Sequence, residues 1–92
     1  MGRTAASARE AARLLRIFPQ PAQGYVQLAW DGTHDLSGPL LLLDAQGRTV
    51  RDYGLLSLHP ASVSPELSLA ELPAGMYWLR WAQLPATPVL KP

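Results

Sequence analysis

Short hydrophobic segments with a repeat of two, separated by proline and glycine, constrain this chain most. Val26, Leu28 and Trp30 lie on one face of segment 25–30 if that segment is extended. Tyr77 and Leu79 alternate in the same way within segment 76–81. Nine prolines and seven glycines interrupt such segments along the chain. A period of two bounded by turn residues predicts β-strands rather than helices.

Other short segments extend this pattern to the end of the chain. Asp31-Gly32, Asp44 to Arg48 and Pro73 to Gly75 have the composition of turns. Further strands are expected over residues 40–43, 49–53, 55–58, 66–69 and 89–91. About seven short strands with close turns predict an all-β fold, a small antiparallel immunoglobulin-like β-sandwich. Its core is expected to contain Phe18, Val26, Leu28, Trp30, Leu41, Leu43, Val50, Leu69, Leu72, Tyr77 and Leu79.

The first sixteen residues have a different composition. Residues 4–16 are rich in Ala, Arg and Leu, which favour helices, but an isolated helix this short is marginal in water. Pro19 and Pro21 stop any helix that begins there. We therefore expect a flexible or weakly helical arm over 1–16, a linker or a vector-derived segment, and a sandwich over 17–92. The apolar face of the arm is too small for a membrane-surface helix.

Charge and composition exclude several classes of function. Residues 1–16 contain four arginines and one glutamate, which gives +3, and residues 17–92 contain four basic and six acidic side chains, which gives −2. The body therefore lacks the basic surface of a nucleic-acid-binding domain. The chain has no cysteine, so neither disulfides nor a cysteine-based zinc site can form. No segment approaches the roughly 20 apolar residues of a membrane span.

The polar side chains suggest no catalytic centre. His34 with Asp31 and Asp35 is the one local cluster; surface-loop residues are the favoured explanation, and a weak cation site is the alternative. Ser57 lies near His59, but no nucleophile-elbow motif surrounds it. Phosphate-binding glycine motifs are absent as well. We therefore expect no enzyme activity, no cofactor and no metal.

Two surface features allow a binding role. Trp78 shares a predicted strand face with Arg80, so it is either a half-buried sheet residue or an exposed aromatic platform for a sugar or a protein. Residues 89–91 form either an edge strand open to strand addition or an ordinary edge protected by Lys91 and Pro92.

The order of four motifs resembles a known family. The segments are Phe-Pro-Gln-Pro-Ala at 18–22, Leu-Asp-Ala-Gln-Gly-Arg-Thr-Val at 43–50, Leu-Ala-Glu-Leu-Pro-Ala-Gly-Met-Tyr-Trp-Leu-Arg at 69–80, and Val-Leu-Lys at 89–91. Together they resemble the type A C-terminal sorting domain of type IX secretion cargo in Bacteroidota. Gln20 stands where the family usually has Asn, and residues 55–65 match no motif of the family.

The resemblance implies a secretion signal at the end of a longer exported protein. It implies transit through the periplasm, recognition by an outer-membrane translocon, a shuttle barrel and a sortase, and cargo at the cell surface or released. A carbohydrate-binding or adhesive module and a tail retained on a secretion component are the alternatives. The motif and recognition residues that the resemblance implies are Pro19, Pro21, Asp44, Gly47, Arg48, Leu72, Pro73, Gly75, Tyr77, Leu79, Val89, Leu90 and Lys91.

Overall fold

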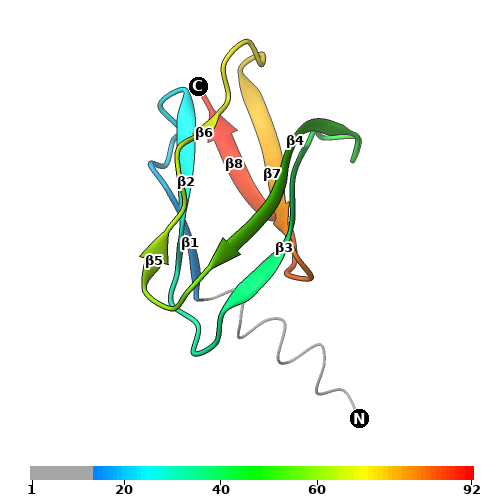
Figure 1. Cartoon of the computed structure of the whole chain (residues 1–92). Coiled ribbons are helices and arrows are strands. Elements are labelled where there is room, and N and C mark those ends of the chain that lie inside the picture. The colour runs from blue at the N-terminus through cyan, green and yellow to red at the C-terminus, as the bar shows by residue number, and fades with distance from the viewer. Residues whose placement is uncertain (1–13) are drawn as a thin grey trace.

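The computed structural model describes residues 14–92, which form two antiparallel sheets facing each other (Figure 1). This arrangement confirms the predicted all-β sandwich. Residues 1–13 of the arm expected over 1–16 lie outside the described residues. The strands are β1 (Leu15–Phe18), β2 (Tyr25–Trp30), β3 (Leu36–Leu43), β4 (Thr49–Leu58), β5 (Ser62–Val63), β6 (Leu67–Ser68), β7 (Gly75–Trp81) and β8 (Thr87–Lys91).

One sheet, here called the long sheet, has the strand order β4-β3-β7-β8. The β3–β4 hairpin closes through Gly47 N–H, which donates to Asp44 O at 2.9 Å, and Gly47 adopts φ +81°, a conformation that favours glycine. The expected strands over 49–53 and 55–58 are one strand, β4, which continues through two register shifts against β3. These bulges let a ten-residue strand bend without breaking the ladder.

The other sheet, here called the short sheet, is built around β2. Strand β1 pairs with one side of β2 along four residues, whereas the two-residue strands β5 and β6 pair with the other side. Between β5 and β6, the buried Ser64 side chain accepts a hydrogen bond from Leu28 N–H at 2.9 Å. Ser64 N–H in turn donates to Leu28 O at 2.8 Å. These two hydrogen bonds of Ser64 therefore take the place of strand pairing with β2 between β5 and β6.

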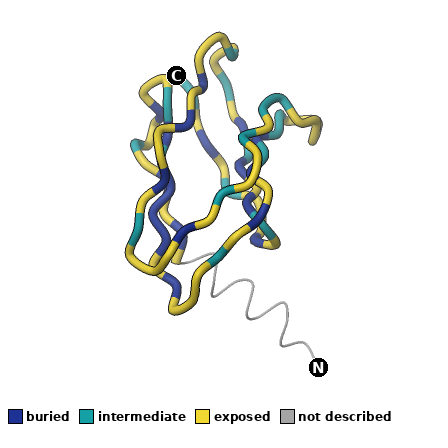
Figure 2. Tube along the Cα trace, viewed as in Figure 1, coloured by how far each residue is buried: buried dark blue, intermediate teal, exposed yellow. Residues whose placement is uncertain are grey.

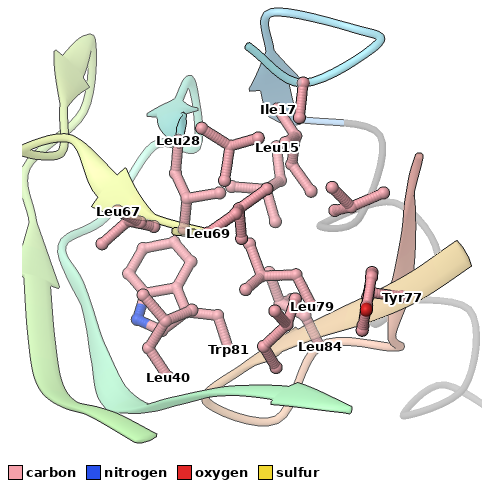
Figure 3. Close-up of a cluster of buried hydrophobic side chains, with 14 of the residues drawn as sticks. Leu15, Ile17, Leu28, Leu40, Leu67, Leu69, Tyr77, Leu79, Trp81 and Leu84 are labelled. Atoms are coloured by element: carbon pink, nitrogen blue, oxygen red, sulfur yellow. The ribbon is translucent and has the colours of Figure 1, made fainter. Parts of the chain in front are cut away.

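The hydrophobic core fills the space between the sheets (Figure 3). Trp30 of the short sheet meets Trp81 of the long sheet edge to face, with ring centroids 5.7 Å apart. Such an edge-to-face pair contributes about 0.5–1.5 kcal/mol beyond the apolar area that it buries. The largest fully buried side chains are Trp81, Leu28, Leu40, Leu42, Leu69, Leu79, Val26 and Val89.

Three core assignments made from the sequence are wrong. Leu40 and Leu42 face the core, and the expected Leu41 and Leu43 are only half-buried on the opposite face. Residues 40–43 are all leucine, so no alternation of polar residues reveals which pair points inward. Phe18 is also mostly on the surface, at 36% exposed, because Leu15 and Ile17 take the inward positions of β1.

Strand β1 also affects where the folded region starts. It includes Leu15 and Arg16, two residues upstream of the boundary expected at residue 17. Buried positions alternate with more exposed ones along β1, as they do along β3 and β7, and buried positions occur in both sheets (Figure 2). Within residues 14–92, no helix is long and apolar enough to cross a membrane.

Candidate functional site

All four motif segments reach one end of the sandwich (Figure 1). At this end are the loop between β1 and β2, the β3–β4 hairpin turn, the turn before β7 and the last residues of β8. Gly75 pairs with Lys91, and Leu43 pairs with Trp78, so the register brings three of these segments together. We call this region the motif end. Strand β1 begins at the opposite end, where its first residue, Leu15, pairs with Trp30 at the end of β2.

The turn before β7 is held by side chains from β7 and β8, and both side chains belong to the family motifs. Tyr77 Oη donates to Pro73 O at 2.5 Å, and Lys91 Nζ donates to Leu72 O. Within the turn, Leu72 N–H donates to Leu69 O at 3.2 Å while Glu71 adopts φ +68°. The motif tyrosine and the lysine near the C-terminus therefore each fix one of two consecutive carbonyl groups in this turn.

Strand β4 supplies two more donors to the same segment. Tyr53 Oη donates to Ser68 O at 2.7 Å, and Arg51 Nη2 donates to Ala70 O. Burial raises the pKa of the Tyr53 phenol, with an opposing effect from Arg51. The family motifs do not include these two residues, and the sequence pattern alone places them only on a strand. Four side chains of the long sheet thus hold four carbonyls of segment 68–73, which arrives from the short sheet.

The outer edge of β8 is closed by the loop between β1 and β2. Ala22 N–H donates to Leu90 O at 2.9 Å, and Gln20 Nε2 donates to Pro88 O at 3.3 Å. Pro88 has no N–H to offer on that edge. Of the two alternatives for residues 89–91, the structure favours an ordinary edge, because the outward carbonyl of Leu90 and that of the preceding Pro88 already have partners. Gln20, where the family usually has Asn, is the side chain that makes one of these contacts.

The hairpin turn forms a separate hydrogen-bonded unit. Asp44 Oδ1 accepts from the N–H groups of Gln46 and Arg48, at 2.9 and 3.0 Å, and Asp44 Oδ2 accepts from Arg48 Nε at 3.1 Å. The hydrogen bond from Arg48 N–H is the main reason that the pKa of Asp44 is lowered. Asp44, Gly47 and Arg48 therefore act locally, and they fix the hairpin rather than join the turn before β7.

The remaining motif residues divide between the core and the surface. Leu79 and Val89 are buried core residues, and Leu72 packs against the core from a half-buried position. Leu90 is 43% exposed, Pro73 and Pro21 are exposed, and Pro19 is half-buried. Gly75 adopts φ +153°, which favours glycine at the start of β7. The motif end thus contains a rigid frame of buried residues with exposed atoms beside it.

The alternative chemical sites do not assemble. His59 Nδ1 lies 3.0 Å from Asp35 Oδ1, whereas His34 Nδ1 contacts its neighbour Thr33. Within residues 14–92, no group of three or more His, Cys, Asp or Glu side chains is arranged to hold a metal ion. Ser57 Oγ is hydrogen-bonded to Ser37 Oγ at 2.7 Å.

The two tryptophans of β7 lie on opposite faces of the long sheet. Trp81 is buried, and its indole N–H donates to Leu56 O at 3.1 Å. Trp78 is half-buried on the outer face, beside Leu43 and Pro88. Of the two alternatives for Trp78, the structure therefore favours a half-buried sheet residue.

Comparison with known proteins identifies the family. The family model described as the secretion system C-terminal sorting domain matches residues 16–87, from the second residue of β1 to the first residue of β8. No curated protein and no solved structure gives a significant match. The match covers most of the chain and includes three of the four motif segments in full. The chain therefore belongs to the family of secretion system C-terminal sorting domains, the sorting signals of type IX secretion.

Proposed function

We propose that this chain is a non-catalytic C-terminal signal that directs an exported cargo protein across the outer membrane of a Bacteroidota cell. The observation that carries the proposal is the family match together with the convergence of all four motif segments at the motif end. A sorting signal has to fold independently of its cargo and present one constant surface. A sandwich with an apolar core and a hydrogen-bonded turn meets that requirement.

The proposed route begins in the periplasm, where the folded tail meets the type IX machinery. The outer-membrane translocon, the shuttle barrel and the sortase are its proposed partners, and the sortase removes the tail as cargo reaches the surface or the medium. Because β1 is part of the sandwich, we place the cleavage site upstream of Leu15, within the linker that residues 1–14 provide.

Within the motif end, we assign two different tasks to the motif residues. Tyr77, Leu79, Val89 and Lys91 hold the frame, because their side chains are buried or donate to turn carbonyls. The exposed atoms of Pro73 and Leu90, together with neighbouring Ala74 and Met76, form the surface that the machinery reads.

A secretion assay tests this proposal. The full chain is fused to the C-terminus of a reporter that carries its own export signal, and the fusion is expressed in a type IX-competent bacterium. We expect the reporter at the surface or in the medium. A fusion without residues 87–92 should stay in the periplasm, as should the intact fusion in a strain without the translocon. Periplasmic retention of the intact fusion in the competent strain, or secretion of the truncated one, would overturn the proposal.

The same assay separates the two alternatives. A tail retained on a secretion component would reach its destination with the tail still attached, which is visible as an unshifted reporter mass. A carbohydrate-binding module would leave the reporter in the periplasm. In a separate measurement, the purified chain would bind to a glycan array. Trp81 is buried and Trp78 is half-buried, which speaks against the exposed aromatic surface that a carbohydrate-binding module requires.

A further inference from the structure

Within residues 14–92, the outer face of the long sheet is largely hydrophobic and uncovered. The register directs six large side chains away from the core: Leu41, Leu43, Leu55, Met76, Trp78 and Leu90. We call this set the outer apolar face. Leu55 is 81% exposed, and Met76 and Leu90 are 43% exposed. Contiguous hydrophobic surface on this scale usually marks a place of interaction rather than random exposure.

The hydrophobic side chains are continuous across the sheet. Leu43 pairs with Trp78, and Trp78 pairs with Pro88, so one row crosses three strands. Met76 pairs with Leu90 in a neighbouring row. The equivalent face of the short sheet also exposes Phe18 and Val63, but Gln27 and an ion pair between Arg16 Nε and Asp31 Oδ2 at 3.5 Å interrupt it. The row of hydrophobic side chains across three strands is therefore a feature of the long sheet.

Two opposite charges flank the centre of this face. Leu41 pairs with Asp52 of β4 on one side and with Arg80 of β7 on the other. The two charged residues are both exposed and are separated by two strand spacings, about 10 Å. In the part of the chain from Leu14 onward, neither of them has an ion-pair partner. Each charge is therefore available to a group that approaches the face from outside.

The placement of these charges is self-complementary. A two-fold axis that lies in the interface along β3, above Leu41, exchanges the β4 side of the face with the β7 side of a second copy. That operation places Asp52 of each copy opposite Arg80 of the other, while leucines meet on the axis. An in-plane axis perpendicular to the strands would place each charge opposite its own copy, which is unfavourable.

We infer that the outer apolar face binds a second copy of this chain, face to face, with two Asp52–Arg80 ion pairs. Two sheets packed in this way keep their strands roughly aligned, as in ordinary sandwiches. Four strands by eight residues span about 14 Å by about 27 Å, so the contact is smaller than a standard interface of about 800 Å² per partner. The association is therefore weak and depends on concentration, so Met76 and Leu90 remain open to the secretion machinery in the monomer.

Sedimentation velocity of the full chain tests the association. We expect a monomer at low micromolar concentration that shifts toward a dimer as the concentration rises. Arg80→Asp and Asp52→Arg each place like charges opposite one another twice in the dimer, and each should weaken dimerisation at least tenfold. Asp52→Asn serves as a control for the hydrogen bond from Gly54 N–H to Asp52 Oδ1, at 2.8 Å, and should weaken the dimer less than Asp52→Arg.

Mixing the two charge variants gives the decisive result. Each variant alone remains monomeric, whereas an equimolar mixture restores both ion pairs and should dimerise like the original chain. Circular dichroism of each variant confirms that it is folded. A chain that stays monomeric at every concentration, a mixture that does not dimerise, or a dimer unaffected by both reversals would overturn the inference. None of these outcomes depends on whether the chain directs secretion.

Discussion

Both sheets bury an apolar inner face, but their strands are paired in different ways. In the long sheet, β3 is paired along its whole length with β4 and for four residues with β7. In the short sheet, β2 has a regular partner on one side only, and Ser64 completes the other side. Both sheets nevertheless present fully buried side chains to the core, such as Leu42 and Leu28. A sandwich can therefore tolerate an irregular sheet if each inward position stays apolar and each buried backbone group finds a partner.

The comparison also separates the inner from the outer face of the long sheet. Leu42 and Leu43 are neighbours on β3, but Leu42 is fully buried and Leu43 is half-buried on the outer apolar face. Leu42→Ala should lower the free energy of unfolding by about 2–5 kcal/mol, because it removes buried methyl groups and leaves a cavity. Leu43→Ala should cost about 1 kcal/mol.

Urea denaturation at low protein concentration measures both values. Equal losses for the two variants would mean that the outer apolar face is as well covered in solution as the core. That result would break the distinction between the two faces.

Loss of the Ser64 side chain, which completes the short sheet, should have the next largest effect on stability. Ser64→Ala removes the acceptor of the buried Leu28 N–H, which should lower the free energy of unfolding by about 1–3 kcal/mol. Ser57→Ala, at an exposed serine of the long sheet, is the matched control and should change it by no more than about 0.5 kcal/mol. Amide exchange at Leu28 should accelerate in the Ser64 variant only. Unchanged exchange there would show that the short sheet does not depend on this side chain.

Substitutions that loosen the turn before β7, which joins the two sheets, should lower stability less. Tyr77→Phe removes the donor to Pro73 O and keeps the ring in the core, and Lys91→Met removes the donor to Leu72 O. Each should lower the free energy of unfolding by about 0.5–1.5 kcal/mol. Thermal unfolding provides the measurement, and the secretion assay provides a second readout. If secretion disappears in a variant that remains folded, that side chain contributes to recognition as well as to the frame.

The smallest effect on stability is expected from a substitution in the β3–β4 hairpin of the long sheet. The folded state lowers the pKa of Asp44, mainly through the hydrogen bond from Arg48 N–H, relative to its ordinary value of 3.8. The stabilisation is therefore present above about pH 3.8 and is lost as the pH falls through the lower pKa of the folded state. Asp44→Asn should remove this part of the acid dependence, measured as melting temperature between about pH 2 and 6. An unchanged acid profile would show that the hairpin bonds do not stabilise the fold.

The sequence predicts the two sheets unequally well. The segments around Val26 and Tyr77 alternate clearly, so strands β2 and β7 follow from their pattern. The leucine run of β3 indicates a strand but not its inward face, because all four positions are apolar. Strand β1 is missed because Leu15 and Ile17 follow a segment of helix-favouring residues. Alternation predicts a strand only where polar and apolar residues differ.

The candidate site shows a similar division. The motifs identify Tyr77 and Lys91, but not that both donate to consecutive carbonyls of the same turn. Arg51, Tyr53 and Gln20 complete the hydrogen bonding of the motif end, and no local pattern marks them. These contacts join residues up to 68 positions apart, so they depend on how the sheets pack rather than on neighbouring residues.

The separation between Leu14 and the motif end has a mechanical consequence for any protein joined upstream. The two lie at opposite ends of the sandwich, and a strand of eight residues such as β3 spans about 27 Å between them. The described chain therefore enters the sandwich at the end that lies away from the turn before β7. A ligand bound at the motif end would contact the sandwich at about that distance from the point where the chain enters it.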